Sequence, residues 1–366
     1  MKTLGHHKGG DTMGKSRLTT CLMGLLVLAA FTMMGCEGKE GPAGPSGTAG
    51  TAGVSGVAGP AGPAGPAGAA GADGADGVDG ELAELTCTQC HNSTNLITGK
   101  LADWEQSVHG NGGAFLYAGG RGSCAACHSG ASFKDMLEAG ETVDTYGVAN
   151  PSSVRQDCRT CHEIHVTGTE ADWALTTTDA VELFALGTTF EGGKGNLCTN
   201  CHQPRRAIAD AVDGVISVTS THWGPHHGPQ SSMLVGLGGA GQDGSPMLHY
   251  SGIANTCVSC HLGEGQDHTF LPSTDACQTC HSGTEDFDIN GTQTEIQEKL
   301  DTLGALLIAA GALDETGDHP VVGDYPEATA QALWNWIYIA HEDKSLGVHN
   351  PAYTRALLDA GLTALQ

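Results

Sequence analysis

The stretch Cys198-Thr199-Asn200-Cys201-His202 shows a pattern, Cys-x-x-Cys-His, that the 366-residue chain contains six times. The composition alone would give about 0.03 such matches, so chance does not explain the repetition. The six copies account for every cysteine after residue 36. They are Cys87, Cys90 and His91; Cys124, Cys127 and His128; Cys158, Cys161 and His162; Cys198, Cys201 and His202; Cys257, Cys260 and His261; and Cys277, Cys280 and His281.

The spacing within each motif suits the covalent attachment of haem c. Two thiols three positions apart add to the two vinyl groups of one haem, and the adjacent histidine reaches the iron as proximal ligand. A zinc site would need two facing cysteine pairs and no histidine fixed behind each of them. Disulfide bonds would leave the six histidines unexplained. The motifs therefore predict six covalently bound haems per chain.

On these motifs the chain is identified as a member of the multihaem c-type cytochromes, which it resembles over residues 81–366. The resemblance implies a mostly α-helical and irregular, haem-packed domain with few strands and with helices at its C-terminus. The composition agrees, because hydrophobic residues make up 39% of the chain and aromatic residues only 5%. So few apolar side chains cannot fill the interior of the domain by themselves. About one haem per 32 residues between positions 87 and 281 would fill the remaining interior.

Ten histidines beyond the N-terminal apolar segment remain for the six distal positions on iron, against three methionines. Ligation by two histidines is the economical interpretation, and it gives lower reduction potentials than methionine–histidine ligation. Six of the ten lie in segments that resemble ligand segments of multihaem cytochromes. The predicted distal ligands are His109, His165, His226, His249, His268 and His349. His222 and His227 stay open as rivals of His226, whereas His319 and His341 fit no recurring pattern and are interpreted as surface or supporting side chains.

Residues 1–35 are typical of a signal peptide. Lys15 and Arg17 precede an apolar run of about 17 residues, which is at the short edge for a membrane span. The run ends in Gly35-Cys36, which resembles a bacterial lipobox and implies cleavage before Cys36 and lipidation of its thiol. An uncleaved anchor is the alternative. The expected location is the outer membrane or cell surface, with a periplasm-facing lipoprotein as the variant.

Residues 36–80 hold a collagen-like repeat, in which glycine stands at every third position from Gly38 to Gly80. Only glycine fits at the axis of a collagen triple helix, so strict period three is its physical signature. Proline occupies the second place of five triplets. The repeat predicts a homotrimeric stalk, and an extended, unassociated linker is the alternative.

The remaining chain divides into a haem-binding segment, residues 81–290, and a cysteine-free segment, residues 291–366. Helical periodicity predicts three helices in the second segment, of which the last begins with Asn350 as N-cap and Pro351 in the first turn. Thr292 and Glu295 have capping-box spacing. Residues 286–291 match half of a calcium loop, but Gln297 stands where the bidentate glutamate belongs, which favours a plain turn.

The charge balance limits the partners. Forty-one acidic against 16 basic residues give a formal net charge of −25, which excludes nucleic acid because phosphate binding needs clustered Lys and Arg. Redox partner proteins or extracellular acceptors fit better.

The predicted function is electron transfer, without a catalytic residue. A reductase of the nitrite or sulfur-oxyanion type is the first alternative, and it would need one iron with an open position. A subunit of a cytochrome filament is the second, and the lipobox and stalk oppose it.

Overall fold

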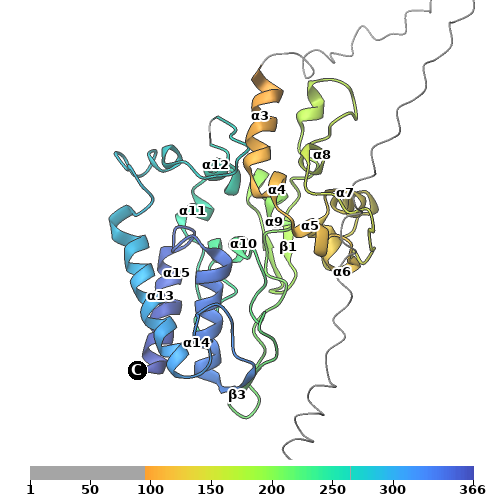
Figure 1. Cartoon of the computed structure of the whole chain (residues 1–366). Helices are drawn as coiled ribbons and strands as arrows, with labels where there is room; N and C mark the ends of the chain where they lie inside the picture. The colour runs from red at the N-terminus through yellow and green to blue at the C-terminus, as the bar shows by residue number, and fades with distance from the viewer. Residues whose placement is uncertain (1–94, 264) are drawn as a thin grey trace, which may run out of the picture. The chain divides into compact units, whose positions relative to one another are not determined.

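The computed structural model describes residues 95–263 and 265–366 (Figure 1). All of them belong to the second of two compact units, Gly77–Gln366. The signal segment, Cys36, the collagen-like repeat and the first motif, which comprises Cys87, Cys90 and His91, lie outside the described residues.

Short helices joined by irregular chain make up the motif-bearing part. The helices up to residue 291 are α3 (Asn95–Gln106), α4 (Val108–Asn111), α5 (Ala114–Tyr117), α6 (Gly122–His128), α7 (Gly130–Ala139), α8 (Cys158–Cys161), η2 (Glu170–Trp173), η3 (Gly193–Gly195), α9 (Asn196–Thr199), α10 (Gln230–Leu234), α11 (Leu248–Ser251), α12 (Cys257–His261), η4 (Thr274–Cys277) and η5 (Ile289–Gly291). Within the described residues this confirms the mostly helical and irregular fold class.

Two small antiparallel sheets complete this region. β1 (Val181–Leu183) pairs with β2 (Thr188–Phe190). β3 (Val215–Val218) pairs with β4 (Gly323–Pro326), and the register sets Val218 opposite Gly323. The second sheet thus joins the motif-bearing part to the C-terminal part.

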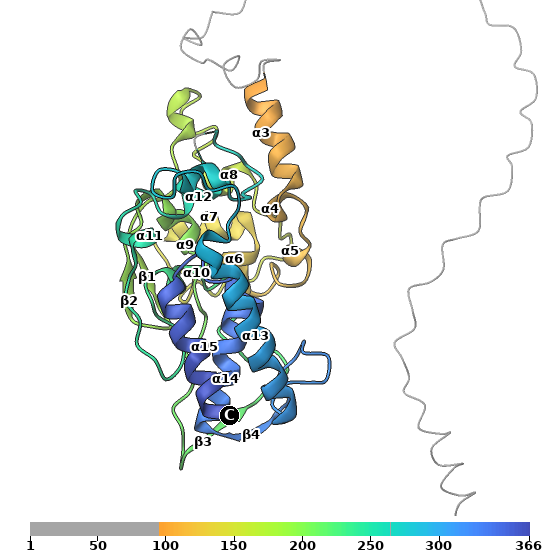
Figure 2. The ribbon, with the colours of Figure 1, turned by 90° about the vertical axis from the view of Figure 1, so that its left-hand side faces the viewer.

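Three longer helices form the C-terminal part, and Figures 1 and 2 show them side by side. They are α13 (Thr292–Ala309), α14 (Glu327–Ile337), which continues as the π-helical turn η6 (Tyr338–Asp343), and α15 (Pro351–Leu365). The side chain of Asn350 accepts a hydrogen bond from the backbone N–H of Tyr353, which confirms the expected N-cap of α15.

The start of α13 corrects one expectation. Thr292 is not the N-cap, because Gly291 holds that position with a φ of +71° and no side-chain cap. The carboxylate of Asp288 instead accepts hydrogen bonds from the backbone N–H groups of Gln293 and Thr294. The acidic segment before the helix therefore serves as a turn that satisfies the first helical amides.

The side-chain core is unevenly distributed. The largest cluster of buried apolar residues joins α13, α14 and α15 to residues 216–240, and it includes the fully buried Trp334 and Tyr338. The clusters around Phe133 and around Phe190 are small. The motif-bearing part therefore has little apolar side-chain core of its own.

Candidate functional site

Five of the six motifs lie in the described part of the chain, each in or beside a short helical turn. In α8 and α12 a helical turn spans the two cysteines, so residues three positions apart share one face. Asp157 caps α8 in a reciprocal pair with Thr160 and fixes the entry of the chain into this motif. Local structure thus presents both thiols of a motif to the same side.

The first motif lies outside the described residues, and the last one extends beyond its helical turn. Cys87 and Cys90 lie outside the described residues, so haem attachment there stays a prediction. In the last motif Cys277 ends the turn η4, and Cys280, which follows that turn, is exposed. The backbone N–H of Cys280 donates to the carbonyl of Cys277 over 3.1 Å, so a turn still joins the two predicted attachment points. The last motif is therefore open to solvent at its second cysteine.

Each of the five described motif histidines faces one other histidine ring. The ring centres are 6.2 to 6.4 Å apart in every case. The pairs are His128 with His226, His162 with His268, His202 with His109, His261 with His349 and His281 with His249. Every pair joins one predicted proximal ligand to one predicted distal ligand, although no pair is close in sequence.

The ring separation fits an iron atom between the rings. An atom bonded to one nitrogen of each ring at about 2.0 Å would separate the ring centres by about 6.3 Å. Edge-to-face rings in direct contact have centres about 4.5 to 7 Å apart, so the distance alone does not identify a metal. The stronger observation is that all five pairs have nearly the same separation and that each joins a motif histidine to another histidine. The residues present therefore fit haem c with two axial histidines at each of the five described motifs.

Hydrogen bonds hold the other ring nitrogen of several of these histidines. A histidine that binds a metal characteristically engages its second nitrogen with an acceptor, which fixes the ring and leaves one nitrogen for the metal. The Nδ1 atoms with such acceptors belong to His162 (Trp173 carbonyl, 2.8 Å), His202 (Gln230 Oε1, 3.0 Å), His249 (Val348 carbonyl, 2.6 Å), His261 (Phe270 carbonyl, 2.8 Å), His268 (Gln266 carbonyl, 2.7 Å) and His349 (Asp343 Oδ1, 2.6 Å).

Burial keeps several of these rings neutral. It lowers the pKa of His109 to about 4, with a further contribution from His202. It also lowers the pKa of His226 to about 4, assisted by the charge of Arg205. Metals bind the neutral imidazole, so a low pKa in the absence of metal favours ligation at neutral pH.

The three neighbouring histidines 222, 226 and 227 have different surroundings. His226 has a φ of +80°, a left-handed conformation uncommon outside glycine, and its ring faces His128. The Nδ1 of His227 lies 2.9 Å from the carboxylate of buried Glu342, and this hydrogen bond raises the pKa of His227. His222 faces His319. Of the three, His226 is the one whose ring faces a motif histidine, and the choice of His226 as ligand stays a prediction.

His349 differs from the other histidines because its Nδ1 contacts a carboxylate. Asp343 is buried, and its second oxygen accepts hydrogen bonds from the backbone N–H and hydroxyl of Ser345. Burial opposes the charged form of His349, but the neighbouring Asp343 carboxylate outweighs it and raises the pKa of His349. The sequence analysis did not identify Asp343 as a hydrogen-bond partner of His349. Its position six residues before this predicted ligand could have indicated that role.

Thiols of different motifs lie close together. The Cys127 thiol interacts with that of Cys201, and the Cys198 thiol with that of Cys257. Burial raises the pKa of Cys161 to about 12. The attachment points of the second, fourth and fifth motifs are therefore neighbours, which agrees with close packing of the groups they carry.

The remaining candidates lie apart from these pairs. His165 is exposed and has a φ of +66°, and its backbone N–H donates to Asp172. His341 packs against Trp336, with ring centres 4.9 Å apart.

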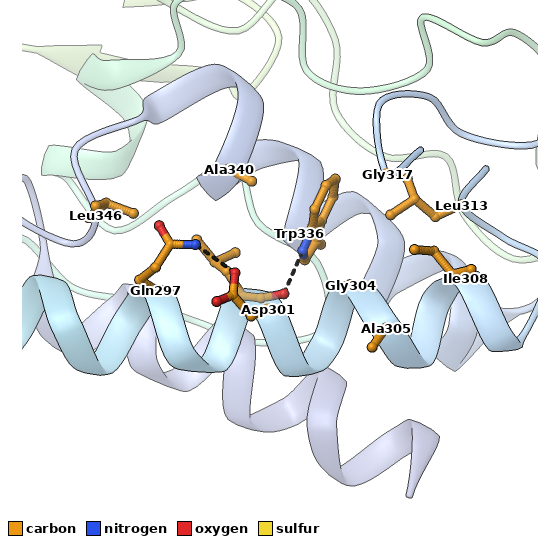
Figure 3. A pocket seen from close by; sticks show the side chains of 11 residues that line it. Gln297, Asp301, Gly304, Ala305, Ile308, Leu313, Gly317, Trp336, Ala340 and Leu346 are labelled. Atoms are coloured by element: carbon orange, nitrogen blue, oxygen red, sulfur yellow. Dashed lines mark hydrogen bonds between the residues drawn. The ribbon is translucent and has the colours of Figure 1, made fainter. Parts of the chain in front are cut away.

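A groove of about 380 Å³ beside α13 is lined by Trp336, Leu313 and Leu346 among others (Figure 3). Since no histidine or cysteine is among its lining residues, this groove is not the haem site.

Comparison with known proteins agrees with the motifs and the fold. Residues 33–84 match the family described as "Collagen triple helix repeat (20 copies)", and residues 76–163 match "Cytochrome c7 and related cytochrome c". These matches are consistent with a multihaem c-type cytochrome that has a collagen-like stretch, and cytochromes of this kind carry haem c.

The similar proteins are also polyhaem cytochromes. The "C-type polyheme cytochrome OmcC" of Geobacter sulfurreducens is 25% identical, with 52% of this chain and 32% of the relative aligned. The "C-type polyheme cytochrome OmcB" of the same species is 24% identical, over 52% of this chain and 33% of the relative. The chain therefore spans about a third of the length of these curated relatives.

Two solved structures are also similar. The outer cell wall cytochrome OcwA has a TM-score of 0.46 at 23% identity, covering 73% of this chain and 50% of the other. The undecaheme cytochrome from the S-layer of Carboxydothermus ferrireducens has a TM-score of 0.42 at 20% identity, covering 73% and 39%. Among the described residues, no helix is long and apolar enough to cross a membrane.

Proposed function

We propose that the chain transfers electrons through six covalently attached haems c, each with its iron held by two histidines. Haem c supplies the iron(III)/iron(II) couple. The observation that carries the proposal is the set of five ring pairs. Each joins a motif histidine to one further histidine, and the distance between the ring centres leaves room for an iron atom bonded to both rings. The contacts between thiols of different motifs support a path from one haem to the next.

The sixth haem belongs to the first motif, with Cys87 and Cys90 as its attachment points, and we assign His165 as its distal ligand. Five of the six predicted distal histidines already face the five described motif histidines, which leaves His165 and the first motif's His91 as the remaining members of the two sets. The backbone at His165 has a positive φ, as it does at His226.

Electron transfer is favoured over a reductase because a substrate such as nitrite must bind iron directly. An iron with two histidine ligands has no vacant position, whereas outer-sphere transfer needs only a haem edge near the surface. Each described motif already has its facing histidine.

The cellular setting is part of the same proposal. A lipid on Cys36 holds the exported chain at the outer membrane or cell surface, and the collagen-like repeat joins three chains into a stalk. The haem-binding domains then pass electrons to redox partner proteins or extracellular acceptors. Tethering and trimer formation both oppose assembly into an open filament.

Stopped-flow oxidation of the fully reduced protein tests this function. Soluble ferric chelates should oxidise it rapidly, while nitrite and sulfite should be turned over negligibly. The net charge of −25 should slow anionic chelates at low salt, and salt should relieve this as the screening length falls to about 10 Å at 0.1 M. Sustained multi-turnover reduction of nitrite would reject the electron-carrier function, and equal salt dependence for anionic and cationic acceptors would reject the electrostatic part.

Asp343→Asn should raise the reduction potential of the haem on Cys257 and Cys260. The Asp343 carboxylate makes His349 a more basic ligand, which stabilises the ferric iron. Loss of its charge should shift this potential upward by tens of millivolts, where about 60 mV is a tenfold change for a one-electron couple. Spectroelectrochemical titration measures the shift. Asp324→Asn, which removes the same charge from an exposed site, is the control, and an equal shift in both variants would contradict a specific effect through His349.

A further inference from the structure

His222 and His319 form one further histidine pair with this ring separation in the described residues, and no Cys-x-x-Cys-His motif contributes to it. Their ring centres are 6.2 Å apart with an interplanar angle of 70°. This separation equals that of the pairs His109–His202 and His128–His226. The two rings therefore stand across the same gap as the rings assigned to iron.

The sheet β3–β4 explains why these two side chains meet. Its register sets Val218 opposite Gly323, and His222 follows Val218 by four residues while His319 precedes Gly323 by four. Continuing the antiparallel register beyond the last ladder pair brings His222 opposite His319. The isolated bridge between Leu313 and Pro320 further holds the loop that carries His319.

A carboxylate and a hydroxyl contact the Nδ1 atoms of the two rings. The Nδ1 of His319 lies 3.4 Å from Oδ2 of Asp314, and the Nδ1 of His222 lies 3.3 Å from the hydroxyl of Thr221. Asp314 is itself held by hydrogen bonds from the Thr316 hydroxyl and from the backbone N–H of Asp318. A carboxylate behind a histidine is the arrangement that orients imidazole ligands toward a metal.

We propose that His222 and His319 bind a divalent transition-metal ion of the zinc, copper or nickel type. Imidazole suits these ions, and a chain of net charge −25 attracts cations. An untethered haem fits less well, because His222 is exposed, the His319 side chain is 53% exposed and the neighbouring side chains are polar. No group of three or more His, Cys, Asp or Glu in the described residues is arranged to hold a metal. Water completes the coordination of the ion, and its affinity is modest.

Calorimetric titration of the full-length, haem-loaded, chelator-treated protein with Zn²⁺ tests the site. The wild type should bind one more Zn²⁺ per chain than His222→Ala or His319→Ala. The double variant should lose no more than either single variant, because both rings hold one ion. His341→Ala is the matched control and should bind as the wild type does. Asp314→Asn should weaken binding about tenfold, since the orienting carboxylate is lost.

Two results would overturn the proposal. The first is an identical Zn²⁺ stoichiometry in the wild type and in both single variants, with unchanged haem spectra and far-UV circular dichroism. It would show that the two rings only make an edge-to-face contact and bind no ion. Uptake of added hemin that depends on both histidines, without any difference in Zn²⁺ binding, would assign the gap to an untethered haem.

Discussion

Replacing His349 with alanine is expected to turn one haem high-spin and to leave the others low-spin. The ring of His349 faces that of His261 with centres 6.4 Å apart, and its Nδ1 is held by buried Asp343. Removing the imidazole leaves that iron with a single protein ligand, which weakens its ligand field. Electron paramagnetic resonance and the high-spin charge-transfer band of the oxidised protein measure the change.

The matched control for this experiment is His341→Ala. His341 lies in the preceding helical turn η6, is partly buried as His349 is, and packs against Trp336. It should leave every haem low-spin. A spectrum of the His349 variant that stays wholly low-spin would show that another side chain holds this iron. Binding of carbon monoxide or cyanide to one haem in this variant alone would give independent support.

Synthesis of the chain without haem attachment is expected to leave most of residues 114–200 unprotected. The buried clusters there are small, whereas α13, α14 and α15 share a large apolar core with Trp334 and Tyr338 at its centre. Burial of apolar surface is the main source of stability, so the motif-bearing part depends on its haems far more than the C-terminal helices do.

Hydrogen exchange with mass spectrometry compares the two parts in the haem-free and haem-loaded chains. Peptides from residues 292–309 and 327–365 should keep most of their protection without haem. Peptides that cover α6 and α8 should exchange at nearly the rate of an unfolded chain. Equal protection of both parts in the haem-free chain would show that side chains alone suffice to fold the motif-bearing part.

The residues alone were sufficient to predict the motifs and the C-terminal helices, and the resemblance to multihaem cytochromes implied the low strand content. The motifs and helices depend on local information: the spacing of cysteines and histidine, the period of apolar residues, and the cap formed by Asn350 before Pro351. The cap of α13 was predicted wrongly: Thr292 and Glu295 have the right spacing, yet Asp288 accepts hydrogen bonds from the amides of Gln293 and Thr294.

The pairing of histidines could not be predicted from sequence. His109 faces His202 rather than the histidine of the nearer motif, and His349 faces His261 rather than that of the last motif. Which two histidines face each other depends on how the short helices pack, and the periodicity of the sequence does not contain this information. His222 and His319 were missed as a pair for the same reason, since they meet through two four-residue strands too short to predict.

The histidine pairs also determine the order in which the two ligands of each proposed haem are synthesised. For the motif histidines His202 and His281, the facing histidine comes earlier in the chain and is already made when the motif appears. For His128, His162 and His261 it comes later. On the proposed ligation, a haem attached to one of these three motifs would have one protein ligand until the rest of the chain follows. The haem proposed for Cys257 and Cys260 would need His349, which lies just before the final helix, so a chain truncated before that point would lack the second ligand of this haem.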